Sequence, residues 1–274
     1  MLFKNANGHA GTGKLRYRAL GWVMKISIVT VVYNNVSTIA QAIESVLSQD
    51  YKDVEYIVVD GRSTDGTIDV INRYKDKISR FVSEPDKGMY DAMNKGIRMA
   101  TGDVVGILNA DDFLCSNDVV SKIVTAFSED KSLEATIADI VFIKESDHNK
   151  VIRYYSARNW RPTKLVWGFM PPHPSFFCKK DVYERYGYYQ TDYKIAADYE
   201  LLIRFLLAKR IRYKYLSMIT TKMRMGGKST RNLNSNFIIN NEIKRGCREN
   251  SVYTNYLMIY SKYFFKPFEF LFNK

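Results

Sequence analysis

Strand-like and helix-like segments alternate along the first half of this chain, and that alternation constrains the fold more than any other feature. Apolar, β-branched runs indicate buried strands, and apolar residues at helical spacing between them indicate helices. The expected strands are 26–33, 54–60, 78–83 and 104–109, and the expected helices are 39–47, 67–74 and 89–100. Such alternation specifies a parallel sheet with right-handed crossovers. We therefore expect an α/β fold with a Rossmann-like, mostly parallel sheet flanked by helices.

Composition narrows the class of protein and its partners. The 274 residues are 46% hydrophobic, which suits one sizeable globular domain. The 41 Lys and Arg against 29 Asp and Glu give a net charge of +12, which favours anionic partners such as nucleotides, phospholipid surfaces or nucleic acid. The three widely spaced cysteines indicate neither a disulfide framework nor a zinc site. No apolar run reaches the roughly 20 residues of a membrane span, so we expect a cytoplasmic protein.

The first 23 residues contain one misleading motif. Residues 8–14 have the spacing of a phosphate-binding loop, but Leu15 stands where a magnesium-binding Ser or Thr belongs, and no strand precedes the motif. We interpret residues 1–23 as a leader that is disordered or that precedes a native start at Met24.

Acidic residues follow three of the four expected strands. Asp60, Asp86 and the pair Asp111 and Asp112 would meet at the carboxyl edge of a parallel sheet, where ligands bind. A turn or helix cap explains any one of these residues. Several carboxylates at one edge repel one another unless a cation or a polar ligand lies between them. Adjacent Asp111 and Asp112 are the hard oxygen donors that a Mg²⁺ or Mn²⁺ diphosphate site requires.

The turn after the first strand argues against a nicotinamide dinucleotide site. It reads Tyr33-Asn34-Asn35 and lacks the Gly-x-Gly-x-x-Gly that holds a dinucleotide diphosphate. A metal on Asp112 is the better holder of a diphosphate. Asp60 is then left to accept hydrogen bonds from a base or ribose.

Five motifs together resemble a known family. They are Tyr33-Asn34, residues 59–67, residues 86–96, Thr101-Gly102-Asp103 and Asn109-Ala110-Asp111-Asp112. In this order and spacing they resemble the inverting glycosyltransferases of family 2, which have the GT-A fold, and in particular those of bacterial surface-polysaccharide synthesis. The resemblance extends from Met24 to about residue 227.

The resemblance implies a role for each matching residue. Asp60 contacts the uracil of a UDP-sugar, Asp111 faces the donor ribose or sugar, and Asp112 coordinates Mn²⁺ or Mg²⁺. The family's usual Asp-x-Asp appears here as Asn109-Ala110-Asp111-Asp112, which makes Asp112 the expected metal ligand. The further residues expected to contact the nucleotide sugar are Val32, Tyr33, Asn34, Arg62, Asp86, Lys87 and Asn94.

Inverting transfer also needs a general base for the acceptor hydroxyl. Asp198 begins an apolar helical segment, a position that equally suits a helix cap. The resemblance favours the base, because the family has Glu-Asp where this chain has Ala197-Asp198; Glu200 is the alternative base. By the same resemblance the segment around His173 lines the acceptor pocket, and we assign His173 to substrate or diphosphate binding.

The last third of the chain is basic and then aromatic. Between Glu200 and Glu242 there are nine Lys or Arg and no acid, which we interpret as a basic face. Residues 226–229 form either a loop that closes over the diphosphate through Lys228 or a merely solvated loop. Residues 253–272 carry aromatics and lysines at helical spacing around Pro267, which we expect to interrupt the helix. An anchor on an anionic membrane surface, docking on the core and a dimer contact all fit that pattern.

These observations give one domain and an extension. We expect a GT-A domain at 24–227, with a nucleotide-sugar half (24–115) and an acceptor half (116–227), and a C-terminal helical extension at 228–274. The expected function is metal-dependent, inverting transfer of a hexose or N-acetylhexosamine from a UDP-sugar to a saccharide or polyprenyl-diphosphate-linked acceptor in polysaccharide or O-antigen biosynthesis. The enzyme would be cytoplasmic or peripheral on the inner face of the plasma membrane, with no nucleic-acid partner.

Two alternatives remain at this point. A nucleotidyltransferase on a similar sheet would also need paired acids and a metal, but would release pyrophosphate instead of UDP. A non-catalytic, basic nucleic-acid-binding protein would show steep salt dependence and no metal dependence.

Overall fold

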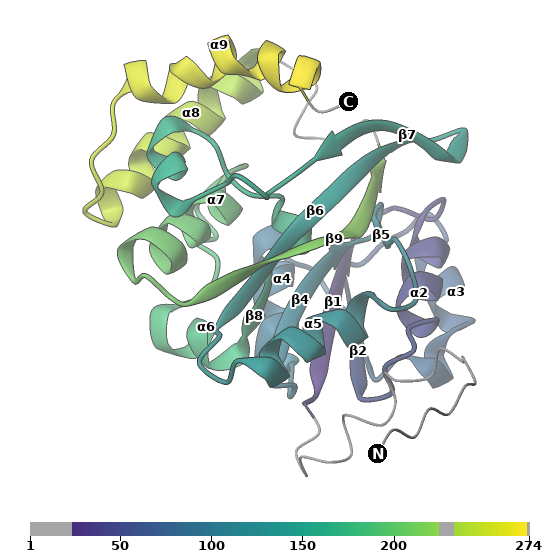
Figure 1. Cartoon of the computed structure of the whole chain (residues 1–274). Helices are drawn as coiled ribbons and strands as arrows, with labels where there is room; N and C mark the ends of the chain where they lie inside the picture. The colour runs from purple at the N-terminus through teal and green to yellow at the C-terminus, as the bar shows by residue number, and fades with distance from the viewer. Residues whose placement is uncertain (1–23, 225–232, 273–274) are drawn as a thin grey trace, which may run out of the picture.

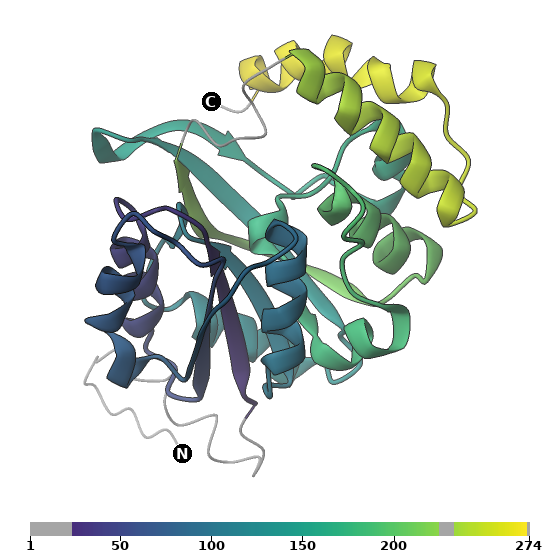
Figure 2. The same cartoon turned by 180° about the vertical axis from the view of Figure 1, so that it is seen from behind.

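A nine-stranded sheet with helices on both faces forms the body of the protein (Figures 1 and 2). The computed structural model describes residues 24–224 and 233–272. The strand order is β3-β2-β1-β4-β8-β6-β9-β5, and β7 pairs with β6. The strands are β1 (Ile26–Val32), β2 (Val54–Asp60), β3 (Arg80–Ser83), β4 (Val104–Asn109), β5 (Phe113–Leu114), β6 (Ala135–Lys144), β7 (Asp147–Tyr155), β8 (Phe177–Lys179) and β9 (Tyr213–Arg224).

The first four strands are parallel, and their register brings their carboxyl ends together. Val32 of β1 lies opposite Asp60 of β2, and Asp60 lies opposite Ser83 of β3. On the other side of β1, Val31 lies opposite Asn109 of β4. The loops that follow these strands therefore meet at one edge of the sheet.

Helices cover this parallel half on both faces. On β1, Ile26 and Ile28 pack into one apolar layer with α2 (Ile39–Leu47) and α5 (Val119–Glu129), and Val29 packs into the opposite layer with α4 (Met89–Met99). Figure 1 shows α5 in front of the sheet, and Figure 2 shows the face that α4 covers. The helices of the main body are α2 (Ile39–Leu47), α3 (Thr67–Asn72), η2 (Lys75–Lys77), α4 (Met89–Met99), α5 (Val119–Glu129), η3 (Pro162–Trp167), η4 (His173–Ser175), α6 (Lys180–Tyr186), α7 (Ala197–Leu202) and the π-helix η5 (Ile203–Ala208).

The rest of the sheet is largely antiparallel. Strand β8 runs antiparallel to both β4 and β6, β7 runs antiparallel to β6, and β5 runs antiparallel to β9. Only β6 and β9 are parallel in this half, among the residues that the structure describes. The predicted α/β class and the four parallel strands are confirmed. The strands β6, β7 and β9 were not predicted. β6 and β9 pair across a long stretch of sequence, but β6 and β7 form a local antiparallel pair, so distance in the sequence does not explain the omission of β7.

Two helices form the C-terminal end of the described chain. Helices α8 (Leu233–Glu249) and α9 (Tyr256–Phe272) lie side by side in both views, and α8 also contacts α7. The expected interruption at Pro267 is wrong, because α9 continues through that residue. A proline removes one backbone hydrogen bond and bends a helix without having to end it. No helix in the described ranges is both long and apolar enough to cross a membrane.

Two predictions fall outside the described residues. They are the leader at 1–23 and the loop at 226–229 with Lys228. Both stay predictions from the sequence.

Candidate active site

The loops after β1 and β2 are joined by hydrogen bonds into one surface. The Gly61 N–H donates to the Val32 carbonyl oxygen at 2.9 Å. The Asn34 N–H donates to Ser63 Oγ, and the Thr64 N–H donates to Asn34 Oδ1, both at 2.8 Å. Asn34 adopts a left-handed backbone conformation with φ 48°, which asparagine tolerates better than most residues. Val32 and Asn34 thus shape the predicted nucleotide site through their backbones and the Asn34 amide.

Asp60 ends β2 with a fully buried carboxylate. Its Oδ2 accepts hydrogen bonds from the Ser63 N–H at 3.0 Å and the Ser83 hydroxyl at 2.6 Å, and its Oδ1 accepts one from the Ser63 hydroxyl. An ionised carboxylate accepts about four hydrogen bonds. Asp60 therefore organises the loops and has capacity for about one further donor. Its predicted contact with a uracil stays a prediction.

Gly61 allows Asp86 and Tyr33 to approach this loop. A Cβ on Gly61 would lie 2.5 Å from Asp86 Oδ2 and 3.3 Å from Tyr33 Cδ2, so a larger residue would displace Asp86. Tyr33 is 57% exposed, and the neighbouring Arg62 and Lys87 are exposed as well. The structure thus places these four predicted donor residues around a single glycine at the surface.

The turn after β4 contains the predicted metal ligand. The Asp112 side chain is 1% exposed, and its Oδ1 has no hydrogen-bond partner among the described residues. The same is true of Asn109 Oδ1, three residues earlier in the turn. Burial and the charge of Asp111 raise the pKa of Asp112 well above its usual range. A buried, unpaired acceptor is costly, so this turn favours a ligand that offers positive charge.

A divalent cation fits this turn. No group of three or more His, Cys, Asp and Glu side chains suited to a metal occurs in the described part of the chain. Mg²⁺-type sites commonly use one or two carboxylates, with substrate phosphates and water completing the coordination. Asp112, with Asn109 or Asp111 beside it, is such a partial ligand set.

Arg224, at the end of β9, lies beside the same turn. Its Nη1 donates to the Asp111 carbonyl oxygen, and its Nη2 donates to Gln41 Oε1 on α2. Its guanidinium also lies over the Phe113 ring, 5.4 Å from the centroid. The strand pairing of β5 with β9 brings this cation to the acids, a contact between residues 113 positions apart that no local sequence signal indicates.

The predicted base Asp198 lies next to His173. Asp198 Oδ2 is 3.4 Å from His173 Nδ1, and its Oδ1 accepts the Tyr199 N–H at 2.8 Å. Burial raises the pKa of Asp198, and the His173 imidazole partly offsets that effect. The two side chains keep exposures of 20% and 36%. A base that is largely buried yet reachable is suited to taking a proton from a bound hydroxyl.

The structure contradicts the alternative prediction that Glu200 is the base. It is 3% exposed and is held by Arg204, one helical turn later, through bonds of 3.0 and 2.8 Å. Arg204 also donates to the carbonyl oxygens of Tyr186 and Tyr188. Arg204 is therefore a buried structural residue and does not belong to the predicted basic face.

Asn94 has a positioning role in this structure. It is 3% exposed, its Nδ2 donates to the Tyr189 carbonyl oxygen at 2.8 Å, and its Oδ1 accepts the Tyr189 N–H at 2.9 Å. One turn earlier in α4, the Tyr90 hydroxyl donates to the Ile195 carbonyl oxygen. Helix α4, which follows Asp86 and Lys87, thus connects the donor loops to the segment that carries Asp198.

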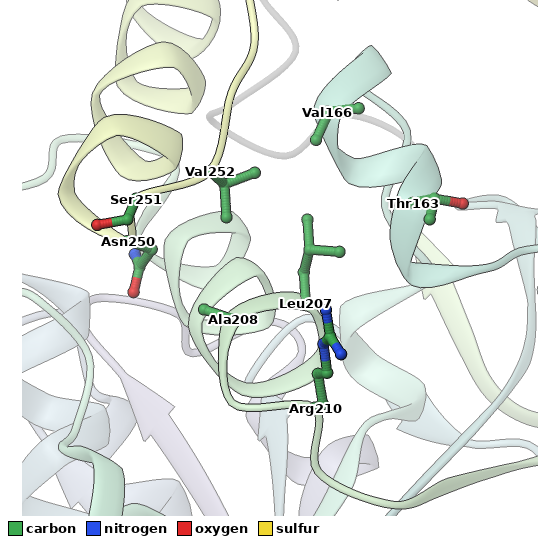
Figure 3. A pocket seen from close by; sticks show the side chains of 8 residues that line it. All are labelled: Thr163, Val166, Leu207, Ala208, Arg210, Asn250, Ser251 and Val252. Carbon is green, nitrogen blue, oxygen red and sulfur yellow. The ribbon is translucent and has the colours of Figure 1, made fainter.

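A separate hollow of about 450 Å³ lies between η3, η5 and the turn from α8 to α9 (Figure 3). None of the predicted site residues lines it. The residues that line it are Thr163, Val166, Leu207, Ala208, Arg210, Asn250, Ser251 and Val252.

Comparison with known proteins gives the family. The model of glycosyl transferase family 2 matches residues 27–226, which is most of the chain. The chain belongs to glycosyl transferase family 2. This membership decides in favour of the glycosyltransferase over the nucleotidyltransferase and the nucleic-acid-binding protein.

Curated relatives agree with this assignment. An uncharacterized glycosyltransferase of Mycobacterium tuberculosis is 30% identical over 181 residues, covering 65% of this chain and 68% of the relative. The Escherichia coli protein WfaP, named UDP-Glc:alpha-D-GlcNAc-diphosphoundecaprenol beta-1,3-glucosyltransferase, is 27% identical over 203 residues, covering 73% of this chain and 77% of WfaP.

Solved structures share the fold. Residues 1–349 of Staphylococcus aureus TarS, in complex with UDP-GlcNAc, superpose with a TM-score of 0.64 at 16% identity, covering 81% of this chain and 66% of that one. The mannosyltransferase PcManGT of Pyrobaculum calidifontis, in complex with GDP-Man and Mn²⁺, gives 0.61 at 19% identity, covering 83% and 64%. The chain spans about two thirds of each of these structures, and the likeness confirms the predicted GT-A fold.

Proposed function

We propose that this family 2 glycosyltransferase transfers a hexose or N-acetylhexosamine from a UDP-sugar, with inversion, to a saccharide or lipid-diphosphate-linked acceptor. The observation that carries the proposal is a pair of carboxylates in different surroundings. Asp112 is buried with an oxygen that has no partner among the described residues, and Asp198 lies beside His173 with part of its surface open. Two such environments suit metal binding and proton abstraction, respectively.

The donor is assigned to residues 24–115 and the acceptor to residues 116–227. The name of WfaP, which pairs a UDP-sugar donor with a diphosphate-linked lipid acceptor, supports both substrate classes. The exposed Tyr33 ring, Arg62, Lys87 and the remaining acceptor capacity of Asp60 support a nucleotide at the donor loops. Lys228 is proposed to contact the diphosphate.

The chemical step follows from the position of the base. Asp198 takes the proton of the acceptor hydroxyl as that oxygen forms a bond to the anomeric carbon. The bond from that carbon to the phosphate oxygen breaks, and UDP leaves with the electron pair. His173 holds the Asp198 carboxylate in place, and Arg224 adds positive charge near the leaving group.

Asp112, with Asp111 or Asn109, would hold a Mn²⁺ or Mg²⁺ ion. When bound, the ion neutralises charge that develops on the departing diphosphate. The buried oxygens of Asp112 and Asn109, which lack partners in the described structure, support this assignment.

The C-terminal helices support a membrane-proximal acceptor. Leu257, Tyr260 and Phe264 of α9 are 84%, 39% and 79% exposed, and their spacing of three and four residues places them on one face of the helix with Tyr256. Lys244 Nζ lies 4.0 Å from the centroid of the Tyr256 ring. We name Tyr256, Leu257, Tyr260 and Phe264 the α9 stripe, and we propose that it rests on an anionic bilayer surface on the cytoplasmic side.

The test is product analysis with a panel of nucleotide sugars. The purified chain is incubated with each donor and Mn²⁺, with and without a chelator, in the presence of lipid-linked or saccharide acceptors. The proposal predicts release of UDP from one donor, loss of that release with chelator, and loss in Asp198→Asn. Pyrophosphate as the product, or no turnover of any nucleotide sugar, would contradict it.

A further inference from the structure

Helix α8 is attached along the whole segment that leads to Asp198. Its Arg245 pairs with Asp192, and its Glu249 accepts a hydrogen bond of 2.6 Å from the Tyr193 hydroxyl. It contacts α7, the helix whose first turn carries the predicted base (Figure 1). The match to the family model ends at residue 226, so α8 lies outside the matched part of the chain.

Glu242 makes the most concentrated of these contacts. Its Oε1 accepts the Lys194 N–H at 2.6 Å, and its Oε2 accepts the Ile195 N–H at 3.0 Å and the Ala196 N–H at 2.8 Å. Three consecutive backbone donors thus converge on one carboxylate, two residues before Asp198. Charge-assisted hydrogen bonds of this kind are shorter and stronger than neutral ones.

Nothing else caps this turn in the described structure. Ala196, the residue before α7, has no side chain that can accept a hydrogen bond, and α7 has no side-chain cap. The Tyr90 hydroxyl holds the opposite face of the same peptide through the Ile195 carbonyl oxygen. The backbone before Asp198 is therefore held between α4 and α8.

We infer that Glu242 is a positioning residue for catalysis: it fixes the backbone of residues 194–196 so that the Asp198 carboxylate faces His173 and the acceptor. The inference rests on the proposed function in taking Asp198 as the base. It makes the C-terminal extension part of the active-site architecture, in addition to any surface role of α9. A base displaced by about 1 Å loses up to about 100-fold in rate, so such a support has measurable consequences.

Electrostatics separate this role from a purely structural one. The groups that face Asp198 are His173 of η4, Glu242 of α8 and Tyr90 of α4, with the rings of Tyr189 and Tyr199 nearby. The negative charge of Glu242 raises the pKa of Asp198, whereas His173 lowers it. Neutralising Glu242 therefore moves the acid limb of the rate to lower pH, in addition to lowering the rate.

The test compares Glu242→Gln with Glu249→Gln in the full chain. Both changes remove a charge from α8, but only Glu242 contacts the 194–196 backbone in the described structure. We expect Glu242→Gln to lower kcat by about 10-fold or more at constant donor KM, to shift the acid limb to lower pH and to reduce amide-exchange protection at Lys194–Ala196. Glu249→Gln should leave the acid limb and that protection unchanged. Glu242→Asp keeps the charge but shortens the side chain by one methylene, so the acid limb should stay in place while protection at Lys194–Ala196 falls. This variant tests the clamp if Glu242→Gln does not fold.

The exchange readout is independent of turnover. Unchanged protection at residues 194–196 in Glu242→Gln, or an unchanged kcat and acid limb, would overturn the inference. If the wild-type chain turned over no nucleotide sugar while the protection loss was still seen, the proposed function would fail and the backbone clamp would stand.

Discussion

Three aspartates of this protein are wholly or largely buried, but each has different hydrogen-bond partners. Asp60 is enclosed and accepts hydrogen bonds from two serine hydroxyls and one backbone N–H. Asp112 is equally enclosed, yet its Oδ1 has no donor in the described structure. Asp198 keeps an opening and a histidine partner. Their partners, not their burial alone, distinguish a loop organiser from the proposed cation ligand and the proposed base.

A change at His173 tests the base directly. Burial raises the pKa of Asp198, and the nearby imidazole counters part of that effect. Because an ionised carboxylate is needed to accept the proton, the rate falls as pH falls through this pKa. In His173→Gln the pKa of Asp198 rises further, so the acid limb of kcat/KM should move to higher pH. The measurement is a pH profile of UDP release.

The matched control is His148→Gln. His148 contacts Gln41 and Phe113 and lies apart from Asp198, so the acid limb of this variant should stay at the wild-type position. An acid limb that His173→Gln leaves in place would show that His173 does not act on the base.

At the scale of elements, close packing of α4 on β1 positions the donor loops. Gly96 faces β1, and a Cβ there would collide with Val29 Cγ1. Overpacking in Gly96→Ala should cost about 1–3 kcal/mol, and the higher helix propensity of alanine should offset roughly 1 kcal/mol of that cost. We therefore expect the free energy of unfolding to fall by up to about 2 kcal/mol. Urea unfolding measures the change.

Gly246 in α8 provides the control for this substitution. A Cβ on Gly246 would lie 3.4 Å from its nearest neighbours beyond the helix, which is ordinary contact, so Gly246→Ala keeps the helix gain without a clash. A Gly96→Ala protein as stable as Gly246→Ala would mean that α4 does not pack as described.

Hydrophobic periodicity in the sequence predicted the strands and helices of the parallel half with nearly correct bounds. The strand at Val104–Asn109 has the bounds that its apolar run indicated, and the helix at Met89–Met99 ends one residue earlier than expected. The proposed base Asp198 and its neighbour His173 were both named from the sequence through the family resemblance, although their contact was not. Glu200 was offered as an alternative base although Arg204, one turn later, was available as an ion-pair partner, a local signal that the sequence carries. The roles of Arg224 and Glu242 depend on long-range contacts, for which one sequence offers no signal.

At the scale of the whole molecule, the α9 stripe and the net charge of +12 define how the enzyme would meet an anionic surface. Leu257→Glu and Phe264→Glu should each weaken binding to vesicles that contain anionic lipid by about tenfold or more, because each removes an apolar side chain worth about 1.5–3 kcal/mol on burial. Vesicle sedimentation measures the binding, and UDP release from the donor alone should be unchanged.

A matched apolar-to-acid change elsewhere controls for charge. Val151 of β7 is 51% exposed and lies outside the α9 stripe, so Val151→Glu should bind vesicles like the wild type. Equal losses in all three variants would mean that overall charge, not the α9 stripe, determines the binding.

The central claim is that a divalent cation on Asp112 holds the diphosphate of the donor, and thermal unfolding with Mn²⁺ and UDP tests it most directly. A ligand at 100 times its Kd stabilises by about 2.7 kcal/mol, which raises the Tm of a chain of this size by several degrees. We predict that rise for the wild type and for Asp118→Asn, whose exposed carboxylate pairs with Lys122, and no rise for Asp112→Asn or with chelator. An equal rise in Asp112→Asn, or a rise that survives chelation, would contradict the claim.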